Sequence, residues 1–228
     1  MSNGTVAAMQ YCERVGDGFW AEPVNAFTNL AFILAAGLLA HRLRRLDVPA
    51  RAIWDLWFLA ILVATIGVGS FLWHTLATRW SELADVVPIL LFISLFILSF
   101  LVRIARLQPV AVLAWFLSYQ AVNAGLQSVL PADFLNGSVF YLPTWGSLWL
   151  MVWYCRSTGS QAAGWLLGAA LVFTGSLLMR TLDNALCVAW PLGLHFGWHL
   201  LNGVTLYLAT RALMSGVAQT GRQGSESY

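Results

Sequence analysis

The sequence predicts an all-α membrane protein, a bundle of seven transmembrane helices built as a single domain over residues 1–228. Apolar residues make up 59% of the chain and charged residues 10%, whereas a water-soluble domain carries about 25% charged residues. The mean hydropathy is +0.72, and apolar runs close to the roughly 20 residues that cross a bilayer recur along nearly the whole chain. This pattern excludes a soluble enzyme, a nucleic-acid-binding protein and a protein with one membrane anchor.

Short polar breaks that contain Arg, Pro, Asp or Ser separate the apolar runs and delimit the predicted helices. The breaks lie at residues 41–49, 78–81, 106–109, 131–133, 156–160 and 182–184. The helices are therefore expected near residues 25–41, 53–76, 83–105, 109–130, 138–155, 161–180 and 190–213. An N-terminal tail over about 1–24 and a C-terminal tail over about 214–228 flank them.

The distribution of arginine predicts the orientation of the bundle. All twelve basic residues are Arg. The loops after the first, third and fifth predicted helices and the C-terminal tail hold nine of them, and the opposite side holds only Arg14, Arg79 and Arg180. Because cytoplasmic loops are enriched in basic residues, we expect the C-terminus in the cytoplasm and the N-terminus outside. The absence of Lys excludes a retinal Schiff base. An Ala- and Arg-rich chain without Lys also suggests a bacterial protein of the inner membrane.

Three of the four histidines lie at one predicted depth. His74 is near the outer end of the second helix, and His195 and His199 are in the first half of the seventh. The i, i+4 spacing of the latter pair puts both imidazoles on one helix face. Two such histidines with a third from another helix can form a three-nitrogen zinc site. A bis-His haem site and simple packing are the alternatives.

Two further polar residues favour catalysis at this place. Ser70 lies one helical turn deeper than His74, and Asp85 falls at the start of the third helix, near the same boundary. An ionisable residue inside a membrane is costly and marks a candidate functional site. A carboxylate beside a metal-activated water is what metal-dependent hydrolysis requires, whereas a haem protein does not need it.

Four segments together resemble the alkaline ceramidase family. GVGSFLWHTL and ELADVVPIL resemble its Ser-x3-His…Asp signature, LHFGWHLLNG its paired-histidine final helix, and YCER…WAEPVNAFTNLAF its N-terminal Cys-Glu…Glu…Asn segment. The resemblance runs from Tyr11 to about Thr210 in matching order. The wider superfamily of seven-helix membrane hydrolases includes the adiponectin-receptor-like proteins.

The resemblance implies a zinc-dependent amidase that cleaves the N-acyl bond of ceramide. His74, His195 and His199 would then bind Zn²⁺ with water as the fourth ligand. Asp85 would be the general base, and Ser70 would bind the developing oxyanion or orient the water. The active site would lie in the outer half of the membrane. In a bacterial host the substrate could be another N-acyl lipid.

The N-terminal segment matches the family less closely. Glu13, Glu22 and Asn25 match a family calcium site, and Asp17 could complete it. The alternative is that Glu22 and Asn25 cap the first helix, with Pro23 in its first turn. The two interpretations are compatible, so Ca²⁺ is a possible second metal.

Two cysteines and two charged residues also fall on the predicted outer side. Cys12 and Cys187 could form a disulfide in an oxidising exterior, and the family resemblance supports this pair. It would tie the N-terminal tail to the loop before the seventh helix. Arg180 and Asp183 are expected to form an ion pair in that loop.

The sequence therefore leaves two classes of function. The first is a membrane amidase acting on a lipid amide. The second is a seven-helix lipid-binding or receptor-like protein in which any metal is structural. Asp85 and Ser70 favour the first, because a structural zinc needs a closed four-ligand site and not an open position beside a base.

Overall fold

The computed structural model describes residues 11–131 and 133–225, and these form helices and loops with no strand. Residues 1–10 of the predicted N-terminal tail lie outside the described residues. The α-helices are α1 Pro23–Thr28, α2 Leu30–Leu43, α3 Trp54–Leu76, α4 Arg79–Arg103, α5 Pro109–Val129, α6 Leu142–Ser157, α7 Ala163–Leu186 and α8 His195–Ser225. Two 3₁₀ segments, η1 Ala50–Ile53 and η2 Phe134–Tyr141, precede α3 and α6.

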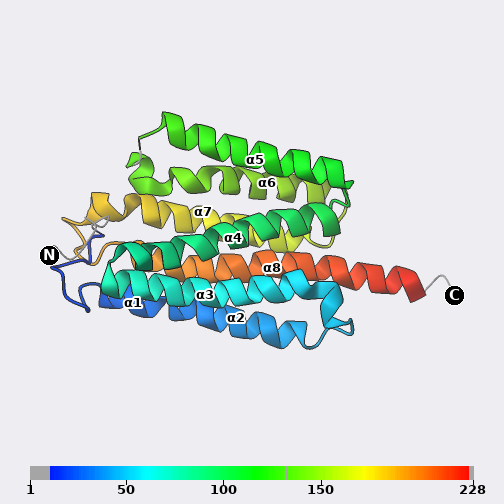
Figure 1. Ribbon diagram of the computed structural model, residues 1–228, viewed down its shortest axis with the longest axis horizontal. Helices are drawn as coiled ribbons and strands as arrows, with labels where there is room; N and C mark the ends of the chain where they lie inside the picture. Colours follow the sequence, from blue (N-terminus) through cyan, green and yellow to red (C-terminus); the bar gives the residue numbers. More distant parts are fainter. Residues whose placement is uncertain (1–10, 132, 226–228) are drawn as a thin grey trace.

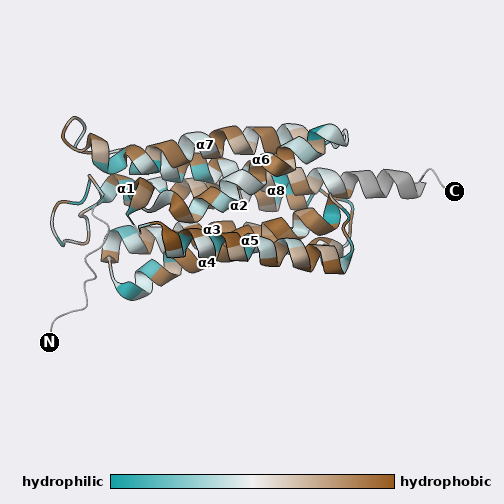
Figure 2. Cartoon of the chain, turned by 90° about the horizontal axis from the view of Figure 1, so that it is seen from above, coloured by the Kyte–Doolittle hydropathy of each residue, from teal (hydrophilic) through white to brown (hydrophobic). Residues whose placement is uncertain are grey.

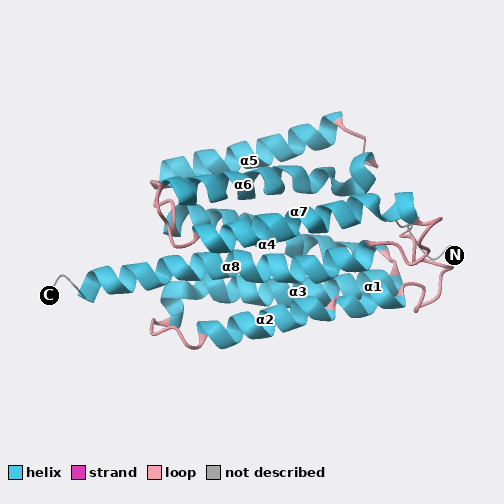
Figure 3. Ribbon diagram, turned by 180° about the vertical axis from the view of Figure 1, so that it is seen from behind, coloured by secondary structure: helices cyan, strands magenta, loops and turns pink. Residues whose placement is uncertain are grey.

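The helices run side by side as seven rods, because α2 continues α1 beyond Asn29 (Figure 1). We call the end of the bundle that holds Leu76, Arg79, Leu186 and His195 the histidine end. Here α1 and α8 begin, and α8 runs to the opposite end (Figure 1). The loops gather at these two ends (Figure 3). A single continuous core of buried side chains joins the helices.

Hydrophobic residues recur along the helices, as the colouring in Figure 2 shows, and many large apolar side chains are exposed on the outside of the bundle. Leu34, Ile61 and Leu113 are each more than half exposed, which suits a surface that faces lipid rather than water. Five helical stretches are long and apolar enough to cross a membrane. They are Pro23–Leu43, Ala50–Leu76, Arg79–Arg103, Pro109–Val129 and Ala163–Leu186. The all-helical, membrane-type fold is thus confirmed, while the seven-span topology and the orientation stay predictions.

Four predicted helix boundaries were wrong. Helix α4 begins at Arg79, because Thr78 and Ser81 form a capping box instead of a break. Helix α7 runs through the break predicted at 182–184 to Leu186, because Asp183 bonds to other segments from within the helix. Helix α8 begins at His195, after a loop containing Gly193, and runs to Ser225 through most of the predicted C-terminal tail.

A partly buried ion pair between Asp55 and Arg103 fixes α3 against α4 at the end opposite the histidines. Arg103 Nε donates to Asp55 Oδ2 at 2.6 Å, and Ser99 Oγ donates to the same oxygen at 2.7 Å. The pair satisfies a charge that would otherwise be costly to bury.

Candidate active site

Three buried histidines converge at the histidine end of the bundle. His74 lies in the last turn of α3, His195 is the first residue of α8, and His199 follows one turn later. One ligand nitrogen of each lies within 4.8 Å of the others. The Nε2 atoms of His74 and His199 are 3.2 Å apart. The structure thus brings together the three histidines that the sequence pattern singled out.

Hydrogen bonds from outside the trio fix two of the rings. Glu22 Oε2 lies 2.5 Å from Nδ1 of His74. The hydroxyl of Thr28 lies 3.0 Å from Nδ1 of His199. This hydroxyl has a single proton and lies 2.8 Å from the carbonyl oxygen of Val24, so it donates there and accepts from the imidazole. Both Nδ1 atoms therefore carry the ring proton, and both Nε2 lone pairs point toward the middle of the trio.

The spacing of the His74 and His199 nitrogens fits two ligands of one metal ion. Two unprotonated nitrogens that face each other across 3.2 Å cannot hydrogen-bond to one another. Nitrogens bound to one zinc at about 2.0–2.1 Å are about 3.3–3.4 Å apart in a tetrahedral site. A haem would need a flat gap between two axial rings, but the imidazole centroids here are 4.7–5.1 Å apart. The geometry favours a single metal ion and not the haem alternative.

Glu22 is ionised where it holds His74. Burial raises its pKa, but the hydrogen bond from His74 and the guanidinium charge of Arg14 more than offset this effect. The net result is a pKa below the ordinary value. Arg14 donates directly to the other oxygen of Glu22. A carboxylate behind a histidine is a recurrent way to orient a metal ligand.

The third imidazole, His195, is held by stacking. The ring of Tyr11 lies against it with a centroid distance of 3.8 Å. Nδ1 of His195 is buried and has no hydrogen-bond partner among the described residues. Because no described residue hydrogen-bonds to this nitrogen, it can bind a ligand.

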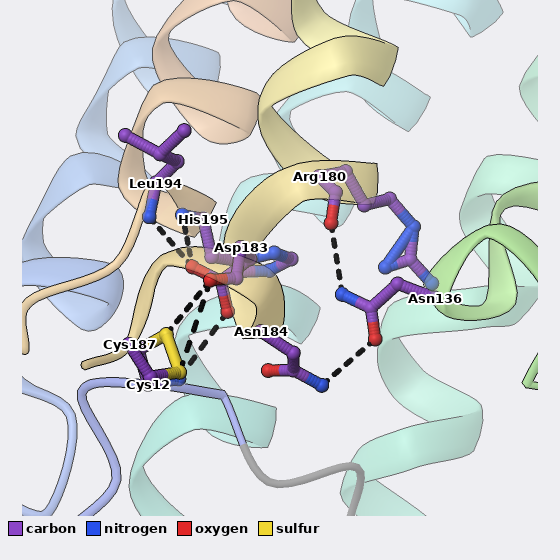
Figure 4. Close-up of a disulfide and its surroundings, with 8 residues drawn as sticks. All are labelled: Cys12, Asn136, Arg180, Asp183, Asn184, Cys187, Leu194 and His195. Atoms are coloured by element: carbon purple, nitrogen blue, oxygen red, sulfur yellow. Dashed lines mark hydrogen bonds between the residues drawn. A yellow bond between two sulfur atoms is a disulfide. The ribbon is translucent and has the colours of Figure 1, made fainter. Parts of the chain in front are cut away.

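Asp183 organises the start of α8 and the N-terminal tail (Figure 4). Its Oδ1 accepts from the backbone N–H groups of Leu194 and His195 at 2.6 and 2.9 Å, and its Oδ2 accepts from that of Cys12 at 3.2 Å. Gly193 has a φ of +67°, and a Cβ there would overlap the Asp183 carboxylate. This carboxylate therefore fixes the start of α8, the helix that carries His195 and His199.

The predicted disulfide between Cys12 and Cys187 is present, next to Asp183. The expected ion pair between Arg180 and Asp183 is wrong. Asp183 is committed to backbone groups, while the guanidinium of Arg180 points away from it (Figure 4). Both residues lie inside α7 and not in a loop.

A cavity of about 270 Å³ opens beside the histidines. Its polar part includes Ser70, Asp85, Arg180, His195 and His199. Asp85 is within electrostatic range of His74 and close enough to Ser70 to interact with its hydroxyl. The structure therefore brings both predicted catalytic residues to the cavity beside the three histidines.

A close approach of α3 and α4 places Ser70 and Asp85 together. A Cβ on Gly69 would overlap the carbonyl of Ala84, so only glycine allows this contact. Pro88 lies inside α4 and lacks the N–H that would bond this carbonyl within the helix. The residues next to the contact, Ser70 and Asp85, consequently meet at the cavity wall.

The predicted calcium residues serve other partners. The Glu13 carboxylate accepts from the backbone N–H groups of Val24 and Asn25 at 2.6 and 2.8 Å. Glu13, and not Glu22 or Asn25, thus caps the first helix, whose first turn contains Pro23 as expected. Asn25 donates to Glu22 at 3.1 Å, its Oδ1 has no partner among the described residues, and Asp17 is exposed. Calcium binding stays a prediction.

The family model for ceramidase matches residues 4–228, nearly the whole chain. The chain belongs to the ceramidase family. No curated protein matches it. Membership supports a ceramide-hydrolysing function and a hydrolase that acts on amide bonds. The histidine trio of this ceramidase-family protein could hold the metal of a metal-dependent enzyme.

Sequence reasoning named Glu22 and Asn25 as candidate calcium or capping residues, but it missed Thr28 and the support that these residues give to the histidines. Glu22, Asn25 and Thr28 recur at intervals of three, which puts them on one face of the first helix. That polar stripe at the start of an apolar span was the available signal. The stacking of Tyr11 on His195 had no comparable signal in the sequence.

Proposed function

We propose that this protein is a zinc-dependent intramembrane amidase that hydrolyses the N-acyl bond of ceramide or a related lipid amide. The observation that carries the proposal is the opening of one cavity onto two of the three clustered imidazoles, a carboxylate and a hydroxyl. A purely structural metal needs neither Asp85 nor Ser70 beside it. This is why the amidase is favoured over a lipid-binding or receptor-like protein.

His74, His195 and His199 would hold the zinc through one nitrogen each. Three protein ligands leave one position open, as in catalytic zinc sites. When bound, the ion would polarise the amide carbonyl and lower the pKa of a water molecule. Glu22 and Thr28 support this assignment, because they keep the ring protons on the far nitrogens of His74 and His199.

Asp85 would act as the general base and then as the acid. It accepts a proton from the water as the new C–O bond forms, and it passes this proton to the amide nitrogen as the C–N bond breaks. Ser70 would donate a hydrogen bond to the oxygen that gains negative charge. The products are a fatty acid and an amine, so atoms and charges balance.

The rest of the cavity suits a lipid chain. Beyond the polar groups it is lined by Phe92, Phe96, Ile97, Met151 and Leu206, among other apolar residues. An amide placed at Asp85 would leave its acyl chain among these side chains. Burial of each CH₂ group there would stabilise binding by about 0.8 kcal/mol.

The test is an amidase assay on the purified full-length protein with ceramide and other N-acyl lipids. Fatty acid release that stops on chelation and returns with Zn²⁺ supports the proposal. No release from any amide by zinc-loaded protein, or release at an unchanged rate in metal-free protein, contradicts it. A Soret band in place of bound zinc would support the haem alternative.

A further inference from the structure

Arg180 carries a positive charge into the cavity from within α7. Its side chain is buried, with 8% of the residue exposed, and it lines the cavity that contains Asp85. Among the described residues no carboxylate lies within 4.0 Å of its guanidinium. In the part of the chain that the structure describes, its guanidinium forms one long hydrogen bond, from Nη2 to the carbonyl of Gly137 at 3.5 Å, and its buried Nε has no partner there.

Aromatic rings satisfy only part of this group. The guanidinium carbon lies 5.5 Å from the ring centroids of both Tyr141 and Trp198. Such cation–π contacts offset part of the cost of the charge but give the guanidinium N–H groups no hydrogen-bond acceptor. A buried charge with free donors is costly unless it meets an anion. Arg180 therefore has no hydrogen-bonded anion among the described residues, and a bound ligand could supply one.

The cavity indicates what that partner is. Two carboxylates line the cavity, those of Glu82 and Asp85. Asp85 is within electrostatic range of Arg180, but among the described residues neither carboxylate lies within 4.0 Å of the guanidinium. The apolar side chains beyond these carboxylates suit an alkyl chain. A ligand that satisfies both parts is an amphiphile with an anionic head. The edge of a guanidinium matches a carboxylate through two parallel N–H···O bonds.

We propose that Arg180 binds the carboxylate of a lipid whose chain occupies the apolar part of the cavity. The source of that carboxylate rests on the proposed function. It is either the head group of an N-acyl amino acid substrate or the carboxylate of the fatty acid product. Both present the same chemistry to Arg180.

Binding without turnover tests the recognition itself. Calorimetry on the full-length protein in detergent would compare palmitate with hexadecanol and palmitamide, each with zinc-loaded and metal-free protein. The metal-free arm separates Arg180 from any carboxylate bound by the metal. We expect Arg180→Gln to weaken palmitate at least tenfold in both arms and to change hexadecanol less than twofold. Arg180→Lys should lose less palmitate affinity, because it keeps the positive charge but not the two parallel N–H donors of the guanidinium.

Arg79→Gln is the matched control, since Arg79 is an exposed cation at the same end of the bundle. It should change palmitate affinity less than twofold. Equal losses for palmitate and hexadecanol in Arg180→Gln would mean a structural role and overturn the proposal. Wild-type protein that binds palmitate no better than hexadecanol would overturn it too.

Hydrolysis then separates the two sources. If the head group is recognised, Arg180→Gln lowers kcat/KM for N-palmitoylglycine at least tenfold more than it lowers kcat/KM for N-palmitoylethanolamine. If the product is recognised, palmitate inhibits hydrolysis of N-palmitoylethanolamine competitively, and Arg180→Gln raises the inhibition constant. If neither amide is cleaved, the proposed function fails, while calorimetry still decides whether Arg180 binds a carboxylate.

Discussion

The Glu22 carboxylate lies 2.5 Å from Nδ1 of His74, so a residue just before α1 orients an imidazole at the end of α3. Glu22→Gln removes the negative charge. Its amide N–H₂ group cannot accept a hydrogen bond from His74 or Arg14. We expect zinc affinity to fall about 10- to 100-fold, as for other residues that support metal-bound histidines. Metal content after dialysis against a zinc buffer measures this change.

Glu13→Gln is the control for this substitution. Glu13 lies in the same segment and caps α1, but it bonds to backbone N–H groups and not to a histidine. It should keep zinc. If Glu22→Gln holds zinc as tightly as the unmodified protein, Glu22 does not support the site.

Asp183→Asn tests the anchoring of α8. The carboxylate accepts three backbone N–H groups, and an amide cannot accept all three. We expect the free energy of unfolding to fall by about 1–3 kcal/mol. Thermal unfolding in detergent measures it. Asn184→Ala, which removes an exposed hydrogen bond to Asn136, should have a smaller effect. Equal effects would mean that Asp183 is not the anchor.

The disulfide joins two positions that are 175 residues apart, so it closes a loop of nearly the whole bundle. Cys12 and Cys187 should resist alkylation until a reductant is added. Replacing both by Ser should lower the free energy of unfolding by about 2–5 kcal/mol. Cys155→Ser is the control, because it replaces a buried cysteine that forms no disulfide. It should lower the free energy of unfolding less. Labelling of Cys12 and Cys187 without reductant would contradict the bond.

The orientation in the membrane is a prediction from arginine. Arg44, Arg51 and Arg106 lie at the end of the bundle opposite the histidines, with most of the basic residues. We therefore expect that end in the cytoplasm and the histidines in the outer half, in a bacterial inner membrane. A reporter fused after Tyr228 should read cytoplasmic. A periplasmic readout would reverse the orientation.

The sequence predicted most of what depends on local pattern. The all-helical membrane-type fold, the grouping of His74, His195 and His199, and the disulfide follow from apolar runs, helical spacing and family resemblance. The sequence did not show that α7 continues past Arg180, because polar residues in an apolar helix look like a break. Asp183 remains helical because its partners, Cys12 and His195, come from other segments.

The sequence did not predict the residues that hydrogen-bond to the histidines, because their partners also come from distant segments. Glu22 and His74 are 52 residues apart, and Thr28 and His199 are 171 apart. Each partner by itself has an ordinary explanation, since Glu fits a helix start and Thr fits an apolar span. Only packing of α1 against α3 and α8 gives these residues their roles.

The most direct test of the account measures zinc content and amide hydrolysis on the same preparations of His199→Ala and Asp85→Asn. His199→Ala removes one of three ligands, so metal and activity should fall together. Asp85→Asn keeps the shape but cannot act as a base, so zinc should stay while turnover falls about 10²- to 10⁴-fold. Loss of zinc in Asp85→Asn would make Asp85 a fourth ligand, and full activity in either variant would contradict the proposed site.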